Sequence, residues 1–156
     1  MLLDPRGPRF AAALTSVVFF AVLVTGSGWL ALAQAVVFAI GAVDPRWGPY
    51  ALLFRALVAP RLGRPTELEP AAPVRFAQLL GLFFALAAAA AYLSGVEVAG
   101  MVLAAGGLVA AFLNSAFGLC LGCEGYLAVR RLTGRPMAAR VPATGKGIPG
   151  SAGGEA

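Results

Sequence analysis

The sequence predicts an all-α integral membrane protein with four transmembrane helices and both termini in the cytoplasm. Three observations predict this fold class. Hydrophobic residues make up 60% of the 156 residues and charged residues only 12%, which is a membrane composition. Long apolar runs alternate with short polar segments. The 12 Lys and Arg residues all fall in segments that four spans would place on one side of the membrane, the cytoplasmic side by the positive-inside rule.

The first apolar block, residues 10–43, is too long for one helix and is interrupted by Gly26-Ser27-Gly28. It therefore predicts a helical hairpin with spans over about 10–26 and 29–43. Each arm would be about 25 Å long, which is short against a hydrocarbon core of about 30 Å. A cleavable signal peptide is the alternative, because Ala31-Leu32-Ala33 resembles a cleavage site; against it, the apolar run continues past that site to Val43.

Two related segments flank this hairpin, Asp4-Pro5-Arg6 before it and Asp44-Pro45-Arg46 after it. An Asp followed by Pro supplies an N-cap acceptor and a residue whose φ suits the first helical turn, so each copy predicts a helix start. A second interpretation is that both copies bring an arginine, Arg6 or Arg46, close to the cysteines described below.

The rest of the chain predicts one interfacial helix and two further spans. Apolar residues interleaved with arginines over about 49–62 are typical of an amphipathic helix lying in the membrane interface. The third span covers about 74–93, and a four-residue turn leads to a fourth span over about 98–127. Residues 1–132 would thus form the membrane domain. The Gly, Pro and Ala content of residues 133–156 predicts a disordered cytoplasmic tail.

The chemically reactive groups of the chain are concentrated in the fourth span, where both cysteines, Cys120 and Cys123, form a CxxC pair followed by Glu124. A continuous helix from Val98 would bring Cys120 to the cytoplasmic boundary after a rise of about 33 Å. An unbroken helix favours a dithiol or a metal pair over a disulfide, because Cβ atoms three residues apart are too distant. The glycines at 118, 122 and 125 could instead open or end the helix, which would allow a redox-cycling pair.

Several functional classes are excluded or disfavoured by composition. Histidine is absent, which removes imidazole-based metal sites, Ser-His catalysis and His proton relays. A net charge of +5 does not indicate nucleic-acid binding, because the basic residues lie between apolar runs. The sequence carries no nucleotide, flavin or quinone signature, so no cofactor is predicted.

The two Asp-Pro-Arg segments and the Phe117-Gly118-Leu119-Cys120-Leu121-Gly122-Cys123-Glu124 motif resemble a bacterial membrane family known as domain of unknown function 4395. The resemblance covers about residues 3–135 and implies a small integral membrane protein of the bacterial inner membrane. The four-helix design is similar to DoxX-like membrane proteins of thiol and sulfur metabolism. By analogy, the resemblance implies a thioredoxin-like or sulfurtransferase partner.

The leading hypothesis is therefore a membrane thiol protein that handles disulfides, persulfides or reduced sulfur at the cytoplasmic face. Cys120 or Cys123 would attack as thiolate and the other would resolve, Glu124 would relay a proton, and Arg6 or Arg46 would hold an anionic group. Soft-metal binding by Cys120 and Cys123 is one alternative, with a second copy or a partner completing the site. A structural subunit of a membrane assembly is the other, and a homo-oligomer is compatible with each.

Overall fold

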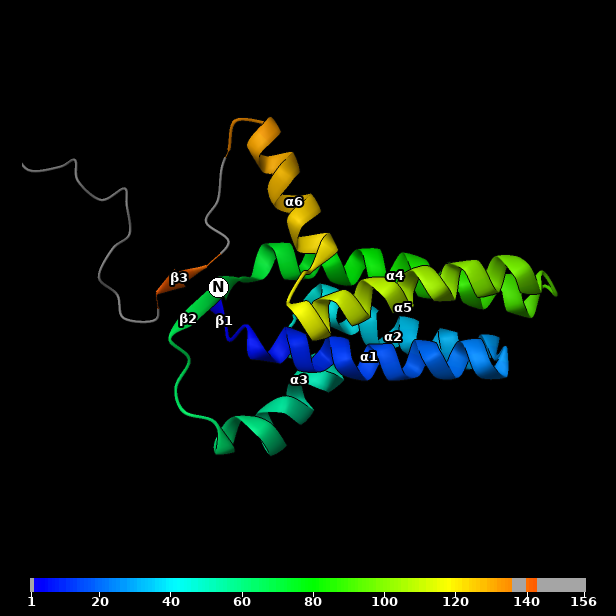
Figure 1. The fold of residues 1–156 in the computed structure, drawn as a ribbon, viewed down its shortest axis with the longest axis horizontal. Coiled ribbons are helices and arrows are strands. Elements are labelled where there is room, and N and C mark those ends of the chain that lie inside the picture. The colour runs from blue at the N-terminus through cyan, green and yellow to red at the C-terminus, as the bar shows by residue number, and fades with distance from the viewer. Residues whose placement is uncertain (1, 136–139, 143–156) are drawn as a thin grey trace, which may run out of the picture.

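The computed structural model describes residues 2–135 and 140–142. Figure 1 shows four long helices in a bundle and a shorter helix turned away from it at one end. The long helices are α1 (Arg6–Thr25), α2 (Gly28–Val43), α4 (Ala71–Leu93) and α5 (Glu97–Phe117), and the shorter one is α6 (Leu121–Leu132). Helices α1, α4 and α5 are long and apolar enough to cross a membrane, whereas α2 is apolar but only 16 residues long. The architecture is thus mostly helical and of membrane type, as composition predicts.

The two hairpin turns lie at the end of the bundle opposite α6. Gly26 ends α1 in the left-handed region, with φ 62°, which glycine adopts without a steric cost. Ser27 then caps α2, because its Oγ accepts a hydrogen bond from the Leu30 N–H at 3.3 Å. The interruption at Gly26-Ser27-Gly28 is therefore where one helix ends and the next begins. Gly95, with φ 82°, makes the corresponding turn between α4 and α5.

The segment between α2 and α4 is helical in three different geometries, in the region where an amphipathic helix over 49–62 is predicted. It comprises α3 (Pro49–Leu53), the π-helical η1 (Phe54–Val58) and the 3₁₀ turn η2 (Ala59–Arg61). The Asp44-Pro45-Arg46 segment forms a turn before α3 instead of starting a helix itself, and the helix starts at the following Pro49. By contrast, α1 begins directly at Arg6, after Asp4-Pro5.

A small antiparallel sheet, which sequence analysis did not predict, lies at the same end as α6 (Figure 1). Its strands are β1 (Leu2–Leu3), β2 (Glu67–Pro70) and β3 (Val141–Pro142), in the order β1-β2-β3. Arg140 forms ion pairs with Glu67 and Glu69 of the middle strand. Part of the tail for which disorder is predicted is therefore paired in β3, and residues 136–139 and 143–156 of that tail lie outside the described residues.

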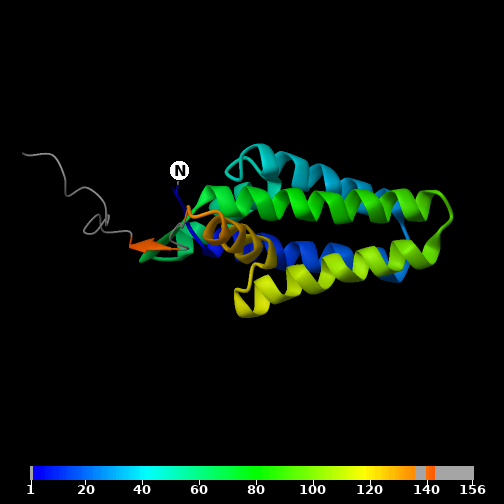
Figure 2. The ribbon, with the colours of Figure 1, turned by 90° about the horizontal axis from the view of Figure 1, so that it is seen from above.

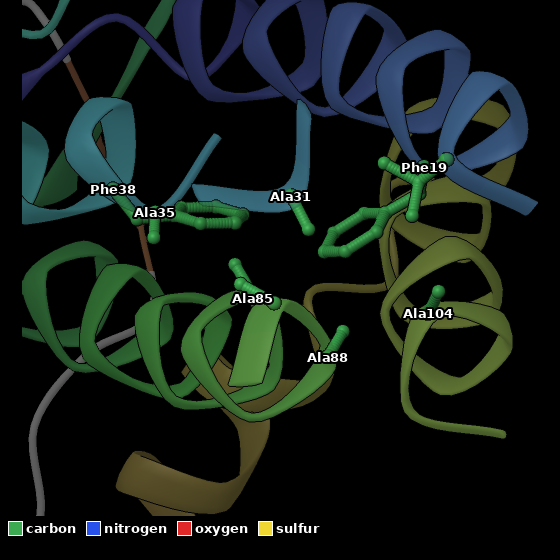
Figure 3. Close-up of a cluster of buried hydrophobic side chains, with 9 residues drawn as sticks. Phe19, Ala31, Ala35, Phe38, Ala85, Ala88 and Ala104 are labelled. Atoms are coloured by element: carbon green, nitrogen blue, oxygen red, sulfur yellow. The ribbon is translucent and has the colours of Figure 1, made fainter. Parts of the chain in front are cut away.

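The bundle consists of two close helix pairs. Helix α2 packs along α4 and α1 along α5, whereas the consecutive helices α1 and α2 touch each other much less (Figure 2). The core in the half next to the hairpin turns is built from alanines, two phenylalanines and Val22 (Figure 3). Phe19 packs against Gly107 of α5 and Phe38 against Gly81 of α4, where an added Cβ would approach each ring to 2.6–2.7 Å. Small residues therefore permit the close helix contacts that membrane bundles require.

The last predicted span, 98–127, is divided into two helices. Gly118 ends α5 in the left-handed region with φ 68°, and its N–H donates to the Asn114 carbonyl at 3.0 Å. After Leu119 and Cys120, α6 runs in a new direction (Figure 1). Sequence analysis left open whether this span is one unbroken helix or is broken at its glycines. The helix is broken, and the cysteines lie at the break.

Candidate functional site

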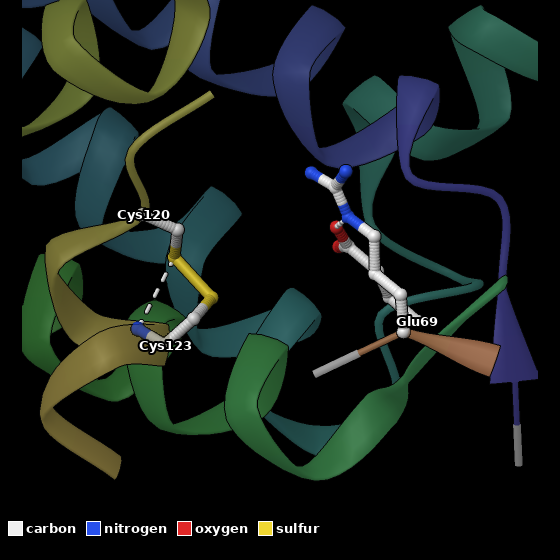
Figure 4. Close-up of a disulfide and its surroundings, with 4 residues drawn as sticks. Glu69, Cys120 and Cys123 are labelled. Atoms are coloured by element: carbon white, nitrogen blue, oxygen red, sulfur yellow. Dashed lines mark hydrogen bonds and ion pairs between the residues drawn. A yellow bond between two sulfur atoms is a disulfide. The ribbon is translucent and has the colours of Figure 1, made fainter. Parts of the chain in front are cut away.

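The cysteine pair lies where α5 and α6 meet, and it forms a disulfide (Figure 4). The Cα atoms of Cys120 and Cys123 are 5.1 Å apart, within the usual range for a disulfide. Cys120 is the N-cap of α6, and its Sγ accepts a hydrogen bond from the Cys123 N–H at 3.2 Å. Both residues are half-buried. The break at Gly118 makes this geometry possible, because an unbroken helix would hold the two Cβ atoms too far apart.

Helix α6 is held by its first turn against the start of α4. Gly122, between the two cysteines, is buried, and a Cβ added there would lie 2.7 Å from the Ala77 Cα and 2.8 Å from the Ala77 Cβ. One turn later, the rings of Tyr126 and Phe76 pack with centroids 5.8 Å apart. Gly122 therefore lets α6 pack closely against the backbone of α4, and this contact fixes the position of the disulfide.

A cavity of about 220 Å³ extends from the disulfide into the bundle. Both cysteines contribute to its lining, and so do Phe19 and Phe38, which separate it from the packed alanine core. The remaining lining comes from α1, α2, α3, η1, α4 and α5 and is mostly apolar. Sequence analysis did not predict this cavity, because most of its lining residues are ordinary small and apolar residues of several helices.

The charged residues of the cavity lining are Asp4, Arg46 and Arg55, and its uncharged polar side chains come from separate helices. Thr15, Tyr50, Gln78 and Asn114 contribute hydroxyl and amide groups. Two of them are linked through the buried Gln34, whose Nε2 donates to Thr15 Oγ1 at 3.3 Å and whose Oε1 accepts from the Tyr50 hydroxyl at 2.7 Å. An apolar lining with a few oriented polar groups is typical of a small-molecule site.

The two predicted arginines lie in different places. Arg46 lines the cavity together with the cysteines, whereas Arg6 lines a second hollow of about 290 Å³ on the neighbouring surface. Each is paired within its own segment: Arg6 Nη2 lies 3.0 Å from Asp4 Oδ2, and Arg46 Nη2 lies 2.9 Å from Asp44 Oδ2. Hydrogen bonding to the Arg46 side chain and backbone N–H lowers the pKa of the Asp44 carboxyl. Both arginines are thus already partly neutralised by a local partner.

The arginine that approaches the cysteine loop is Arg9, which sequence analysis did not single out. Its guanidinium packs against Gly118, two residues before Cys120. With Arg6, Arg64 and Arg140 it also lines the second hollow, whose acidic lining residue is Glu67. Arg9 follows the first Asp-Pro-Arg segment by three residues, and the second segment is followed by no arginine at that spacing; this difference is the signal that the sequence offered.

Glu124, the predicted proton relay, is exposed in the first turn of α6 and belongs to the lining of neither hollow. Its backbone N–H donates to the Cys120 carbonyl at 2.9 Å. Within residues 2–135 and 140–142, no group of three or more His, Cys, Asp and Glu side chains comes together. A metal held by Cys120 and Cys123 would therefore need further ligands from outside these residues, and soft-metal binding stays a prediction.

The fold and the site define a multi-helix membrane-type protein with a CxxC disulfide at one end of its bundle. The chain belongs to the family described as Domain of unknown function (DUF4395), whose model matches residues 3–131. This confirms the family resemblance recognised from the sequence motifs; the similarity to DoxX-like proteins stays a prediction. The comparison with curated proteins and the comparison with solved structures each gave no match.

Proposed function

We propose that this protein is a membrane thiol–disulfide exchange protein whose Cys120–Cys123 pair cycles between disulfide and dithiol. The observation that carries the proposal is the position of the disulfide: it caps a helix, is half-buried and forms part of a cavity wall. A CxxC pair at a helix N-terminus is the arrangement in which one thiolate is stabilised and the other resolves. A disulfide with a purely structural role would need none of these features.

The helix geometry distinguishes the two cysteines. A thiolate on Cys120 would keep the hydrogen bond from the Cys123 N–H and would lie at the positive end of the α6 dipole. Cys120 is therefore the better leaving group and Cys123 the sulfur that a partner thiolate attacks. Attack breaks the Sγ–Sγ bond, forms a mixed disulfide on Cys123 and releases Cys120 as thiolate. The second thiol of the partner then displaces Cys123, so the partner becomes oxidised and the pair becomes a dithiol.

The charged residues around the pair have supporting roles in this proposal. Arg9, packed against Gly118, favours negative charge on the neighbouring Cys120. Glu124, exposed beside Cys123, exchanges protons with water as thiols form and react. Arg46 at the cavity and Arg6 at the second hollow offer guanidinium groups to an anionic partner or a sulfur oxyanion.

The membrane topology proposed is four spans, with the disulfide and the sheet on the cytoplasmic side of a bacterial inner membrane. The sheet supports an even number of crossings, because its three strands must lie on the same side of the bilayer. Helices α1 and α2 connect β1 to β2, and α4 and α5 connect β2 to β3. If α1 crosses, the shorter α2 must cross back, and local thinning of the bilayer accommodates its length. The arginines lie at the same end as the disulfide and the sheet, and by the positive-inside rule this supports a cytoplasmic location for that end.

The partner proposed is a soluble thioredoxin-like or sulfurtransferase protein that carries its own reactive thiol. The exposed first turn of α6 beside Cys123 is the surface that such a thiol would approach. A persulfide carried by the partner reacts by the same displacement at sulfur.

The test compares the single variants Cys120→Ser and Cys123→Ser in lipid nanodiscs. The remaining thiol at Cys120 should react with iodoacetamide at pH 7 about tenfold faster than the remaining thiol at Cys123, because helix-terminal cysteines have a lowered pKa. The wild-type disulfide should also be reduced by a thioredoxin-type dithiol protein. When the oxidised, disulfide form of that protein is supplied to the single variants, Cys120→Ser should form the more persistent mixed disulfide, because Cys123 is the poorer leaving group. A wild-type pair that stays oxidised with that reductant, or equal thiol reactivity in the two variants, would contradict the proposal.

A further inference from the structure

The cavity places an apolar chamber directly against the disulfide. Its opposite end is closed by the buried Phe19 and by Phe38, and its polar lining includes the amides of Gln78 and Asn114. An aqueous reductant or partner protein has no use for such a chamber, because a soluble dithiol reaches the disulfide from the exposed side of α6. The cavity therefore indicates a second reactant that is small and apolar.

The chemistry of the cycle defines what this reactant must do. Each exchange with a partner dithiol leaves Cys120 and Cys123 as thiols, and restoring the disulfide removes two electrons and two protons. The reactant must be lipid-soluble, because it enters a mostly apolar cavity between membrane-type helices. It must also accept two electrons and two protons. Quinones meet these requirements, since the ring is apolar and its two carbonyl oxygens accept the protons.

Resting on the proposed thiol–disulfide cycle, we infer that the cavity binds the ring of a membrane quinone, which reoxidises the Cys120–Cys123 dithiol. The two S–H bonds break and one Sγ–Sγ bond forms; the two electrons and two protons pass to the quinone carbonyl oxygens, and the quinone leaves as quinol. The cysteines are oxidised and the quinone is reduced, so no further oxidant is needed.

The size and polarity of the cavity suit this assignment. Its volume of about 220 Å³ is below the roughly 300 to 1,000 Å³ of pockets for drug-sized ligands, so it holds a ring and not an isoprenoid tail. The side-chain amides of Gln78 and Asn114 can donate to quinone carbonyls, and neither has a side-chain hydrogen bond to another described residue. Small residues such as Ala111 leave the space between the helices for the ring.

The experiment uses the full chain in nanodiscs, reduced and then freed of reductant, under anaerobic conditions. A short-tailed ubiquinone and a short-tailed naphthoquinone serve as probes. One quinol should form for each disulfide regenerated, with thiols counted by alkylation and mass spectrometry. The double variant Cys120→Ser/Cys123→Ser should form none. In the oxidised wild type, a photoreactive azidoquinone should label lining residues of α4 and α5 and be displaced by the short-tailed quinone.

Matched variants on α5 test whether the reaction occurs in the cavity. Ala111→Leu fills space in the lining and should raise the quinone KM about tenfold, the effect of overpacking a close-fitting site. Val109→Leu changes a residue that is 56% exposed on the same helix and does not line the cavity, so it should leave the KM unchanged. Asn114→Leu should raise the KM, whereas Ser115→Leu, at a neighbouring half-buried residue that does not line the cavity, should not.

The outcomes separate this inference from the proposed function. Normal exchange with a dithiol protein but no oxidation by quinone would overturn the quinone assignment and leave the exchange function standing. Quinone reduction that Ala111→Leu leaves unchanged, with photolabel spread over lipid-facing residues, would also overturn the cavity assignment. Absence of exchange with either the dithiol protein or quinone would contradict both.

Discussion

At the end of the bundle where the hairpins turn, the helices approach one another through alanines and glycines, and the buried rings of Phe19 and Phe38 fill the remaining space. At the other end the same four helices enclose a cavity, and a disulfide and several arginines lie around it. The difference shows that the packed half can fix the helix positions, so that the hollow half can keep an open space beside reactive groups.

The largest effect is expected from breaking the packed half. Gly107→Ala places a Cβ 2.7 Å from the ring of Phe19, a side chain that is 1% exposed and must shift to accept it. We expect a loss of about 1 to 3 kcal/mol in the free energy of unfolding, as for other overpacked cores. Thermal unfolding in detergent measures it. The matched control is Gly106→Ala, whose Cβ would meet the half-buried Phe84 at 3.2 Å and should cost less. Equal losses of stability in Gly107→Ala and Gly106→Ala would contradict the tighter packing inferred around Gly107.

The next effect concerns the position of the disulfide in the hollow half. Gly122→Ala would force α6 away from Ala77, where the Cβ would lie 2.7 Å from the Ala77 Cα. We expect the disulfide to become several-fold more accessible to a soluble reductant and the protein to lose about 1 kcal/mol of stability. Gly125→Ala is the control on the same helix, because a Cβ there meets nothing within 4 Å and should stabilise the helix slightly. Reduction rates followed by alkylation decide between these outcomes.

A smaller effect is expected from the arginine beside the cysteine loop. Arg9→Gln removes the guanidinium that packs against Gly118 and should lower the alkylation rate of the Cys120 thiol, in the Cys123→Ser background, by about two- to fivefold at pH 7. Arg61→Gln removes an exposed charge that lines neither hollow and should change the rate much less. The Arg9 effect should weaken in high salt. Equal effects of the two variants would show only a general influence of net charge.

The smallest effect is a pH dependence at Asp44, the ion-pair partner of the cavity-lining Arg46. Because the Arg46 side chain and N–H lower the pKa of Asp44 in the folded protein, this carboxylate stabilises the fold above the ordinary Asp pKa of about 3.9. The contribution is lost as the pH falls below that value through the folded-state pKa. Asp44→Asn should therefore have a slightly lower Tm than wild type at pH 7, and the two should converge in acid. A Tm difference between wild type and Asp44→Asn that grows in acid would contradict a stabilising role for the ionised Asp44.

The positions of the long helices followed from apolar runs and from Gly26 and Ser27, because capping residues act locally. Gly118 shows why the last span was harder. Glycines also occur at positions 106 and 107, where α5 continues unbroken because phenylalanines pack on them. Whether a glycine ends a helix or admits a neighbour depends on tertiary contacts, and a single sequence does not contain them. The disulfide depends on that break and was left open for the same reason.

The cavity and the sheet were not predictable for a different reason. The cavity needs the angles between four helices, and its lining residues Thr15, Gln78 and Asn114 read individually as ordinary polar positions in spans. The strands are two to four residues long and pair across more than 60 residues of sequence, so neither periodicity nor turn residues mark them. The candidate cysteines, by contrast, were found from composition, because no other thiols occur in the chain.

The sheet also sets an order of events during synthesis. Leu2–Leu3 is synthesised before all of the described helices, yet it pairs with Glu69 and Pro70, and β2 in turn pairs with β3 at Val141–Pro142. The sheet is therefore completed only after all of the described helices have been translated. Under the proposed four-span topology, a nascent chain in which one helix fails to cross would leave these strands on opposite sides of the bilayer, with their backbone edges unpaired.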